Sequence, residues 1–261
     1  MDKSFQAAFE SALDWWDAMG VEVPKVAPAK PKARPKNTTP KTQTGPAKTA
    51  SLKTSVPSLS NAARITAAET LAKSAKDLAA LKMAMASFDA GTLSDNAVQC
   101  VFARGNPDSR LMIIGEAPGR DEDIEGKPFA GRSGQLLDRM LAAIGLTEGE
   151  FYVTNVINWR PPGNRNPTPE EIELCRPFLH RHIELAAPEI LLIVGGVSLS
   201  AMTDLTGIMK NRGTWQELKI AGREIPALPI YHPAFLLRRP ELKKEAWRDL
   251  LSLHEKLSEL G

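Results

Sequence analysis

The chain has 261 residues, of which 43% are hydrophobic and 25% charged, and its formal net charge is +2. This composition fits one α/β domain with additional segments. No apolar run approaches the roughly 20 residues of a membrane-spanning helix, and the N-terminus lacks a signal-peptide core, so we expect a soluble, cytoplasmic protein. The two cysteines, Cys100 and Cys175, are too few and too far apart for a disulfide framework or a zinc ribbon.

The first 95 residues divide into three segments. Residues 1–23 carry phenylalanines, a leucine and a tryptophan at helical spacing, which predicts a short amphipathic helix. Residues 24–60 hold seven Lys, one Arg, seven Pro and no acid, which predicts a disordered basic linker. The linker's +8 leaves −6 for the rest of the chain. Residues 61–95 are rich in Ala, Leu and Lys and predict a connecting helix.

The helix and the linker each allow two interpretations. We favour a helix that folds back on the main domain over one that docks on a protein partner. We favour a linker that acts as a spacer, although its charge could also add salt-dependent attraction to a nucleic-acid backbone.

From residue 96 to residue 261, short apolar runs alternate with segments of helical periodicity, and we expect one main domain there. The apolar runs that predict strands are 110–115, 151–157, 189–196 and 227–232. Helices are predicted over 133–146 and from Thr168, where a capping box begins. This alternation is typical of a three-layer α/β/α sandwich with a central, mainly parallel four-stranded sheet.

Polar and aromatic residues follow the predicted strands. Glu116, Glu122 and Phe129 come after the first strand, Asn155 lies near the end of the second, and His232 ends the last. Because ligands of open α/β sheets bind at the carboxyl ends of the strands, we expect these side chains to converge. Carboxylates, an aromatic ring, an amide and an imidazole suit a planar heterocycle that leaves as an anion.

Three motifs carry a resemblance to a known family. They are "GEAPGRDEDIEGKPFAGRSGQLLDRML", "YVTNVINWRPPGNRNPTPEE" and "HPAFLLRRPELKKEAWRDL". Together they resemble the family 4 uracil-DNA glycosylases of bacteria and archaea, from about residue 100 to the C-terminus. The resemblance implies a base-excision repair enzyme that acts on uracil in DNA, a catalytic domain over 96–261, and a cytoplasmic protein associated with the bacterial nucleoid.

The resemblance also implies roles for single residues. Phe129 stacks on the base, Asn155 reads its edge, and Ala117 in the "GEAPG" loop belongs to the same substrate-binding set. His232 faces a carbonyl of the base and stabilises charge on it as it leaves. A carboxylate holds the attacking water, with Glu122 as the first choice and Glu116 as the second.

The chemistry of base excision is consistent with these roles. A base inside a duplex is reached only after the nucleotide flips out, which costs a few kcal/mol. Stacking on Phe129 can return about 1 to 3 kcal/mol of that cost. Asn155 can donate a hydrogen bond to uracil O4 and accept one from uracil N3–H. Cytosine has a donor at position 4 and an acceptor at N3, so neither hydrogen bond can form.

We expect loops at this edge of the sheet to bind DNA. Leu236 is interpreted as an apolar wedge that enters the base stack, flanked by arginines that hold phosphates. The candidate DNA-binding residues are Arg160, Arg165, Lys210, Arg212, Leu236, Arg238 and Arg239. The partner is then uracil-containing DNA, and we expect a monomer.

The chain departs from the family pattern at the metal site. The family typically holds a [4Fe–4S] cluster on four cysteines. Here Cys175 matches one position, Trp159 occupies another, and Cys100 matches neither of the early pair. We therefore expect no cofactor and no metal, with Trp159 filling the space of the cluster.

Two alternatives remain open from the sequence. One is a catalytically weak DNA-binding or polymerase-associated module of the same fold, and the other is a glycosylase for other deaminated bases such as hypoxanthine. A nucleotide hydrolase is not indicated, because the chain has no G-x-x-x-x-G-K-[ST] loop.

Overall fold

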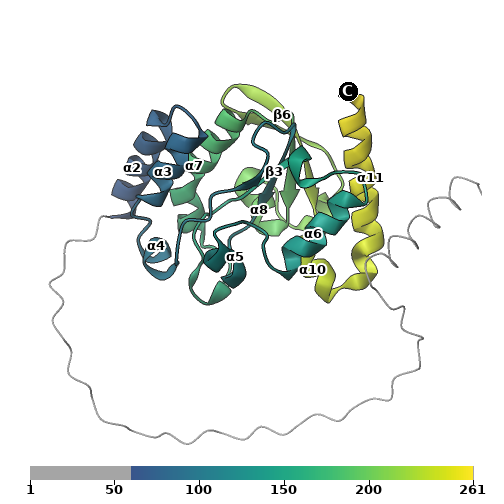
Figure 1. Ribbon diagram of the computed structural model, residues 1–261, viewed down its shortest axis with the longest axis horizontal. Coiled ribbons are helices and arrows are strands. Elements are labelled where there is room, and N and C mark those ends of the chain that lie inside the picture. The colour runs from purple at the N-terminus through teal and green to yellow at the C-terminus, as the bar shows by residue number, and fades with distance from the viewer. Residues whose placement is uncertain (1–59, 261) are drawn as a thin grey trace, which may run out of the picture. The chain divides into compact units, whose positions relative to one another are not determined.

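A six-stranded sheet lies at the centre of the computed structural model, which describes residues 60–260 (Figure 1). The strand order is β1-β3-β2-β4-β6-β5. The strands are β1 (Arg104–Gly105), β2 (Leu111–Gly115), β3 (Phe151–Asn155), β4 (Ile190–Val194), β5 (Gln216–Ile220) and β6 (Arg223–Ile230). The central β3, β2, β4 and β6 are parallel, and β1 and β5 join the two edges antiparallel.

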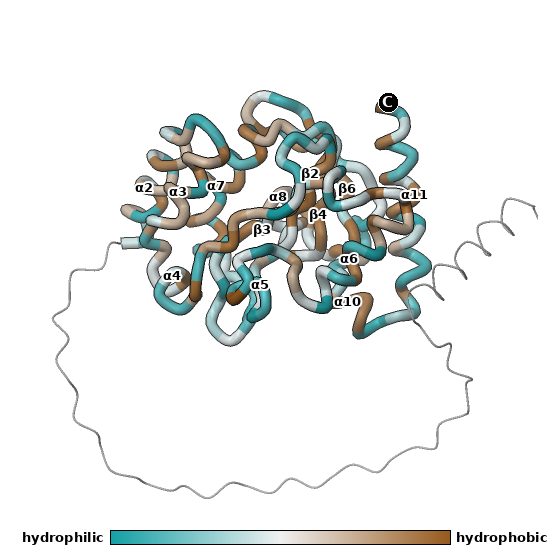
Figure 2. Tube along the Cα trace, in the orientation of Figure 1, coloured by the Kyte–Doolittle hydropathy of each residue, from teal (hydrophilic) through white to brown (hydrophobic). Residues whose placement is uncertain are grey.

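The four predicted parallel strands are confirmed, but the prediction of a four-stranded sheet was wrong, because the sheet has six strands. β1 has only two residues, and β5 alternates between buried and exposed positions because it lies at an edge of the sheet. Neither gives the continuous apolar run that marks β2 and β4, which are buried at every position. Figure 2 shows β2 and β4 in the hydrophobic colour and many residues of the outer helices in the hydrophilic one.

Helices cover both faces of the sheet and confirm the three-layer sandwich. On one face, α7 packs against α2 and α3, and their apolar side chains share one core with β2, β4 and α8. On the other face, α6 packs against α10 and α11, and α11 also contacts β6. The helices are α2 (Asn61–Ser74), α3 (Leu78–Ala86), α4 (Thr92–Asn96), α5 (Arg120–Glu125), α6 (Arg132–Ala142), α7 (Pro169–Ala186), α8 (Gly196–Met202), α9 (Ile208–Asn211), α10 (Pro233–Arg238) and α11 (Lys243–Glu259).

The segment predicted as one connecting helix is instead three helices, α2, α3 and α4. The break follows Ser74, and Asp77 starts α3 because its carboxylate accepts a hydrogen bond from the Ala80 amide at 2.7 Å. Arg181 of α7 donates to the Ala75 carbonyl at 3.0 and 2.6 Å. The described residues 60–260 therefore belong to one compact unit with the sheet. The predictions for 1–23 and for most of 24–60 lie outside the described residues.

Two further sequence features can be compared with the fold. The predicted capping box is confirmed, since Thr168 Oγ1 accepts from the Glu171 amide at 3.3 Å and Glu171 Oε2 accepts from the Thr168 amide at 2.9 Å. Across residues 60–260, none of the helices combines the length and apolarity that crossing a membrane requires.

Candidate active site

A pocket of about 550 Å³ opens at the carboxyl ends of β2, β3 and β6. It brings together all six residues predicted for catalysis and base binding, which come from three separate stretches of the chain. They are Glu116, Ala117, Glu122, Phe129, Asn155 and His232. The convergence expected from the strand ends is therefore observed.

Asn155 ends β3 with its side chain almost fully buried, at 2% exposure. Its Nδ2 has no hydrogen-bond partner among the described residues. Gly115 lies opposite Asn155 in the parallel register, and a Cβ there would lie 2.3 Å from Asn155 Oδ1 and 2.5 Å from the Phe129 ring. Glycine at 115 thus lets the amide and the ring approach β2. A buried donor without a hydrogen-bond partner is costly. A ligand that accepts a hydrogen bond from Asn155 Nδ2 would remove this cost.

Phe129 has a positive φ of 55°, in the left-handed region that side chains other than glycine rarely adopt. The chain then turns back so closely that residue 134 must be glycine, since a Cβ there would lie 1.6 Å from the Phe129 carbonyl oxygen. The ring is 7% exposed and lies against His232, with centroids 5.7 Å apart and planes at 22°. Strained backbone that is held by its surroundings is common where a side chain must be aimed at a ligand.

His232 is the N-cap of α10, and its Nδ1 accepts a hydrogen bond from the Ala234 amide at 3.1 Å. A ring nitrogen that accepts carries no proton, so the neutral imidazole has its proton on Nε2. Burial, with a smaller contribution from Arg238, lowers the pKa of His232 to about 4. At neutral pH the residue is therefore an uncharged donor with a fixed tautomer.

The two glutamates of the site differ in their partners. Glu122 accepts from the Gly119 amide with Oε2 and from the Gly131 amide with Oε1, both at 2.9 Å. It thereby joins the start of α5 to the loop before α6. In the described part of the chain the Glu116 carboxylate is not engaged by another group, and burial raises its pKa above the usual value of 4.5. A partly desolvated carboxylate with free lone pairs is suited to hold water and accept a proton.

The predicted DNA-binding residues fall into two groups. Arg165 and Arg238 line the pocket, and Lys210 is exposed on α9. Arg165 also pairs with both Glu171 oxygens, at 2.7 and 2.6 Å. Arg239 is exposed and pairs with Glu241. These four residues have their charged groups at the protein surface.

The other arginines are bound within the protein. Arg160 donates to Asn164 at 2.6 Å and lies 3.8 Å from the buried carboxylate of Asp123. Arg212 donates to Asp249 of α11 and does not line the pocket. Their bonds to the fold account for these two side chains without DNA.

The structure corrects the interpretation of Leu236 as a wedge. Its side chain is fully buried, because α10 packs this face against α6, so it presents no surface to a base stack. Phe235, one residue earlier, is partly exposed and lines the pocket. Sequence reasoning missed it, although it lies three residues after His232, a spacing that places two residues on the same side of a helix.

The residues present do not fit a four-thiolate iron–sulfur cluster. Cys175 is fully buried, and burial raises the pKa of its thiol. Trp159 is buried in the same hydrophobic core, with its ring 6.2 Å from that of Phe88. Phe88 in turn packs edge-on against Phe178 at 5.0 Å. Within residues 60–260 there is also no group of three or more His, Cys, Asp or Glu side chains that could hold a metal ion.

Comparisons with known proteins identify the family of the chain. Residues 102–251 match the model of the uracil DNA glycosylase superfamily. The chain is 40% identical to a type-4 uracil-DNA glycosylase of Archaeoglobus fulgidus over 58% of this chain and 78% of the relative. It is 41% identical to a type-4 uracil-DNA glycosylase of Saccharolobus solfataricus over 60% and 76%, respectively. A DNA polymerase of Bacillus phage SP01 is 32% identical over 56% of this chain but only 16% of the polymerase. The chain therefore belongs to the uracil-DNA glycosylase superfamily.

Proposed function

We propose that this protein is a DNA-repair glycosylase that hydrolyses the N-glycosidic bond of uracil in DNA and leaves an abasic site. The observation that carries the proposal is the buried Asn155 amide, whose Nδ2 lacks a partner in the described structure, beside the Phe129 ring in the pocket. Uracil O4 can accept from Nδ2 while uracil N3–H donates to Oδ1. Cytosine would leave the buried amide donor facing an amino group, a mismatch that disfavours its binding.

The base reaches this pocket only after its nucleotide leaves the helix. Flipping breaks stacking on both faces of the base, and the held ring of Phe129 replaces one of these contacts. The left-handed backbone of Phe129 and the small Gly115 and Gly134 fix the ring before the base arrives. Less side-chain entropy is then lost on binding.

Bond cleavage needs two kinds of charge stabilisation. As the bond between C1′ and N1 breaks, the electron pair moves to the base, and His232 Nε2–H donates to uracil O2, where negative charge grows. The sugar becomes cation-like, as in other glycoside hydrolyses. Glu116 orients a water toward C1′ and takes a proton as the new C–O bond forms. The uracil anion is later protonated from solvent.

This assignment reverses the order of the two glutamates that the sequence suggested. Both oxygens of Glu122 accept backbone amides, so we assign Glu122 to holding the loop and Glu116 to the water. Arg238 and Lys210 are our first choices for phosphate contacts, since neither is engaged by an acidic side chain in the described part of the protein.

We further propose that the enzyme acts without an iron–sulfur cluster. The indole of Trp159 and the rings of Phe88 and Phe178 form a continuous aromatic contact in this region. Buried aromatic surface of this kind can supply the cohesion that metal–thiolate bonds supply elsewhere.

A polymerase-associated or catalytically weak module is the second candidate, and the similarity to part of a phage DNA polymerase favours it. The complete pocket argues for an enzyme, because a module that only binds DNA has no need for a buried, unpartnered amide. The range of bases is a separate point. Hypoxanthine also offers a carbonyl beside an N–H, so it is the second substrate to assay.

A direct test uses a labelled oligonucleotide with one uracil, incubated with the protein and then treated with alkali. We expect strand cleavage at uracil and none at thymine in a matched control strand. Absence of cleavage at uracil in both single and double strands would show that the enzyme interpretation is wrong. Binding of the same DNA without cleavage would identify the protein as a module of the second kind.

A further inference from the structure

Arg212 follows α9 and is bound to the C-terminal helix α11. Its Nε donates to Asp249 Oδ2 at 2.8 Å, and another guanidinium nitrogen donates to the second oxygen of this carboxylate. The guanidinium also donates to the Glu245 backbone carbonyl at 2.8 Å. Only 16% of the Arg212 side chain is exposed, and 2% of the Asp249 side chain. The arginine is thus directed into the protein.

The same guanidinium covers the ring of Tyr231. The Arg212 Cζ atom lies 5.3 Å from the ring centroid, a distance at which a cation is attracted to the aromatic face. The Tyr231 hydroxyl donates to Glu245 Oε2 at 3.0 Å, and the residue is 1% exposed. Tyr231 is the residue immediately before His232. The ring of Tyr231 is therefore held by Arg212 and by Glu245 of α11, one residue before the imidazole in the chain.

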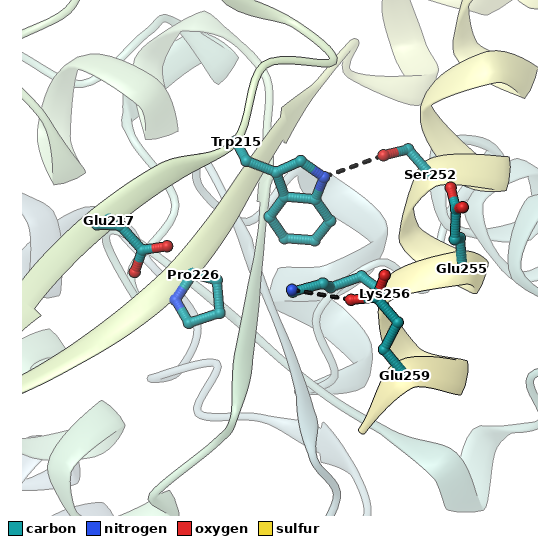
Figure 3. A pocket seen from close by; sticks show the side chains of 7 residues that line it. All are labelled: Trp215, Glu217, Pro226, Ser252, Glu255, Lys256 and Glu259. Carbon is teal, nitrogen blue, oxygen red and sulfur yellow. Dashed lines mark hydrogen bonds and ion pairs between the residues drawn. The ribbon is translucent and has the colours of Figure 1, made fainter. Parts of the chain in front are cut away.

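Neighbouring contacts fasten the loop that carries Arg212. The Gly213 amide donates to the Pro229 carbonyl of β6 at 2.8 Å, and a Cβ on Gly213 would lie 2.4 Å from Asp249 Oδ1. Farther along, the Trp215 indole donates to Ser252 Oγ of α11 at 3.0 Å, as Figure 3 shows. The loop is therefore fixed both to α11 and to the strand that leads into His232.

We propose that Arg212 is a positioning residue for His232, and that it acts by holding Tyr231 against α11. The inference rests on the proposed glycosylase function. A fixed Tyr231 holds the backbone just before His232, and the bond from the Ala234 amide to Nδ1 holds the ring from the residues that follow. A hydrogen-bond donor stabilises the negative charge that grows on one oxygen atom less well when the direction of its N–H bond varies. This role replaces the expected phosphate contact of Arg212.

The test is the substitution Arg212→Lys, which keeps the charge beside Asp249 but loses the planar group that covers Tyr231 and donates to several acceptors at once. We expect the single-turnover rate of uracil excision to fall at least tenfold. The Kd for DNA with a stable abasic-site analogue, and its salt dependence, should stay at the wild-type values. The matched control is Arg181→Lys. Arg181 is also largely buried and bonded, to Ala75 and Glu184, and it lies outside the pocket, so we expect the wild-type rate.

Two readouts separate positioning from other roles. A loss of folded protein would lower the concentration of active enzyme, titrated with the abasic-site analogue, and leave the single-turnover rate constant unchanged. Positioning instead lowers the rate constant at the full active concentration. A phosphate contact would raise the Kd and reduce the salt slope by about one, with little change in the rate of the bound enzyme. Either of those results, or a wild-type rate in the folded variant, would overturn the proposal.

If Arg212→Lys does not fold, Glu245→Gln weakens the same contacts at a partly exposed residue. We then expect at least a threefold lower single-turnover rate constant at the full concentration of active enzyme, and an unchanged rate constant would overturn the proposal. Failure of the proposed function is recognised separately, since the wild-type protein itself would then not excise uracil.

Discussion

The ring of Phe129 is stacked on the imidazole of His232, with centroids 5.7 Å apart and planes at 22°. The two residues are more than 100 positions apart in the chain. One belongs to the loop after β2 and the other caps α10 after β6. Their contact joins the stacking surface for a base to the donor that acts on its carbonyl, so changes at either residue should affect both recognition and cleavage.

The first prediction separates the two glutamates. Glu116→Gln should lower the single-turnover excision rate by about 10²-fold to 10⁴-fold, the range typical of a lost general base. In the wild type, activity should fall as the pH drops through the pKa of Glu116, which lies above 4.5, because the protonated acid cannot take a proton from water. Glu122→Gln should lower the melting temperature, since one oxygen that accepts an amide becomes a donor. A larger rate loss in Glu122→Gln, at an unchanged melting temperature, would restore Glu122 as the water-binding residue.

The second prediction concerns base selection by Asn155. Asn155→Asp should weaken uracil excision, because a carboxylate cannot donate a hydrogen bond to uracil O4. It should also permit some excision of cytosine, because the carboxylate can accept a hydrogen bond from the cytosine amino group. The measurement is cleavage of matched strands with uracil or cytosine at one position. Asn96→Asp, at the end of α4, serves as the control and should behave as the wild type. Unchanged uracil excision in Asn155→Asp would remove this residue from base recognition.

The third prediction concerns His232. His232→Ala should lower the excision rate by about 10² to 10³, the usual effect of removing one donor from a developing anion. Its pKa of about 4 keeps the imidazole neutral from pH 5 upward, so His232 should add no change in rate between pH 5 and 8. His254→Ala on α11 is the control, and it should excise uracil at the wild-type rate. A rate in His232→Ala equal to that control would place the catalytic donor elsewhere.

The fourth prediction concerns stability at low pH. His182 is buried, its ring bonds to the Tyr152 hydroxyl at 2.9 Å, and burial lowers its pKa to about 3 from 6.5. The unfolded chain therefore binds a proton that the folded one does not. The contribution to stability is complete above pH 6.5 and is lost as the pH falls toward 3, by about 2 kcal/mol at pH 5. Urea unfolding at pH 7.5 and pH 5 measures it.

His182→Gln keeps a group that can bond Tyr152 but does not titrate, so its stability should fall less between these two pH values than that of the wild type. Equal pH dependence in both proteins would show that His182 is not the source.

The fifth prediction concerns iron. Protein purified without oxygen should be colourless and free of stoichiometric iron, because only two cysteines are present and Trp159 is buried in the same core as Cys175. Metal analysis and a visible spectrum check this. A broad brown absorption with about four iron atoms per chain would contradict it.

As a test of the aromatic contact, Trp159→Ala should lower the free energy of unfolding by about 3 to 5 kcal/mol, the usual cost of truncating a large buried aromatic side chain.

Local sequence was sufficient for the features that depend on neighbouring residues. The apolar runs of the four parallel strands, the capping box at Thr168, and the placement of Asn155 at the end of a strand and of His232 two residues after one all follow from periodicity and short-range spacing. Because parallel strands share one edge for their carboxyl ends, these patterns also predicted that the site residues would meet.

Tertiary structure alone decided what each of those side chains bonds to. Glu122 accepts a hydrogen bond from an amide nine residues away, and Arg212 donates to a carboxylate 37 residues away. Leu236 is buried where α10 packs against α6. The edge strand β5 likewise owes its place to pairing with β6 and not to an apolar run. The physical reason is the same in each case. Burial and hydrogen-bond partners arise from segments distant in sequence, so residue type and spacing specify the groups available to a site but not which of them remain free to react.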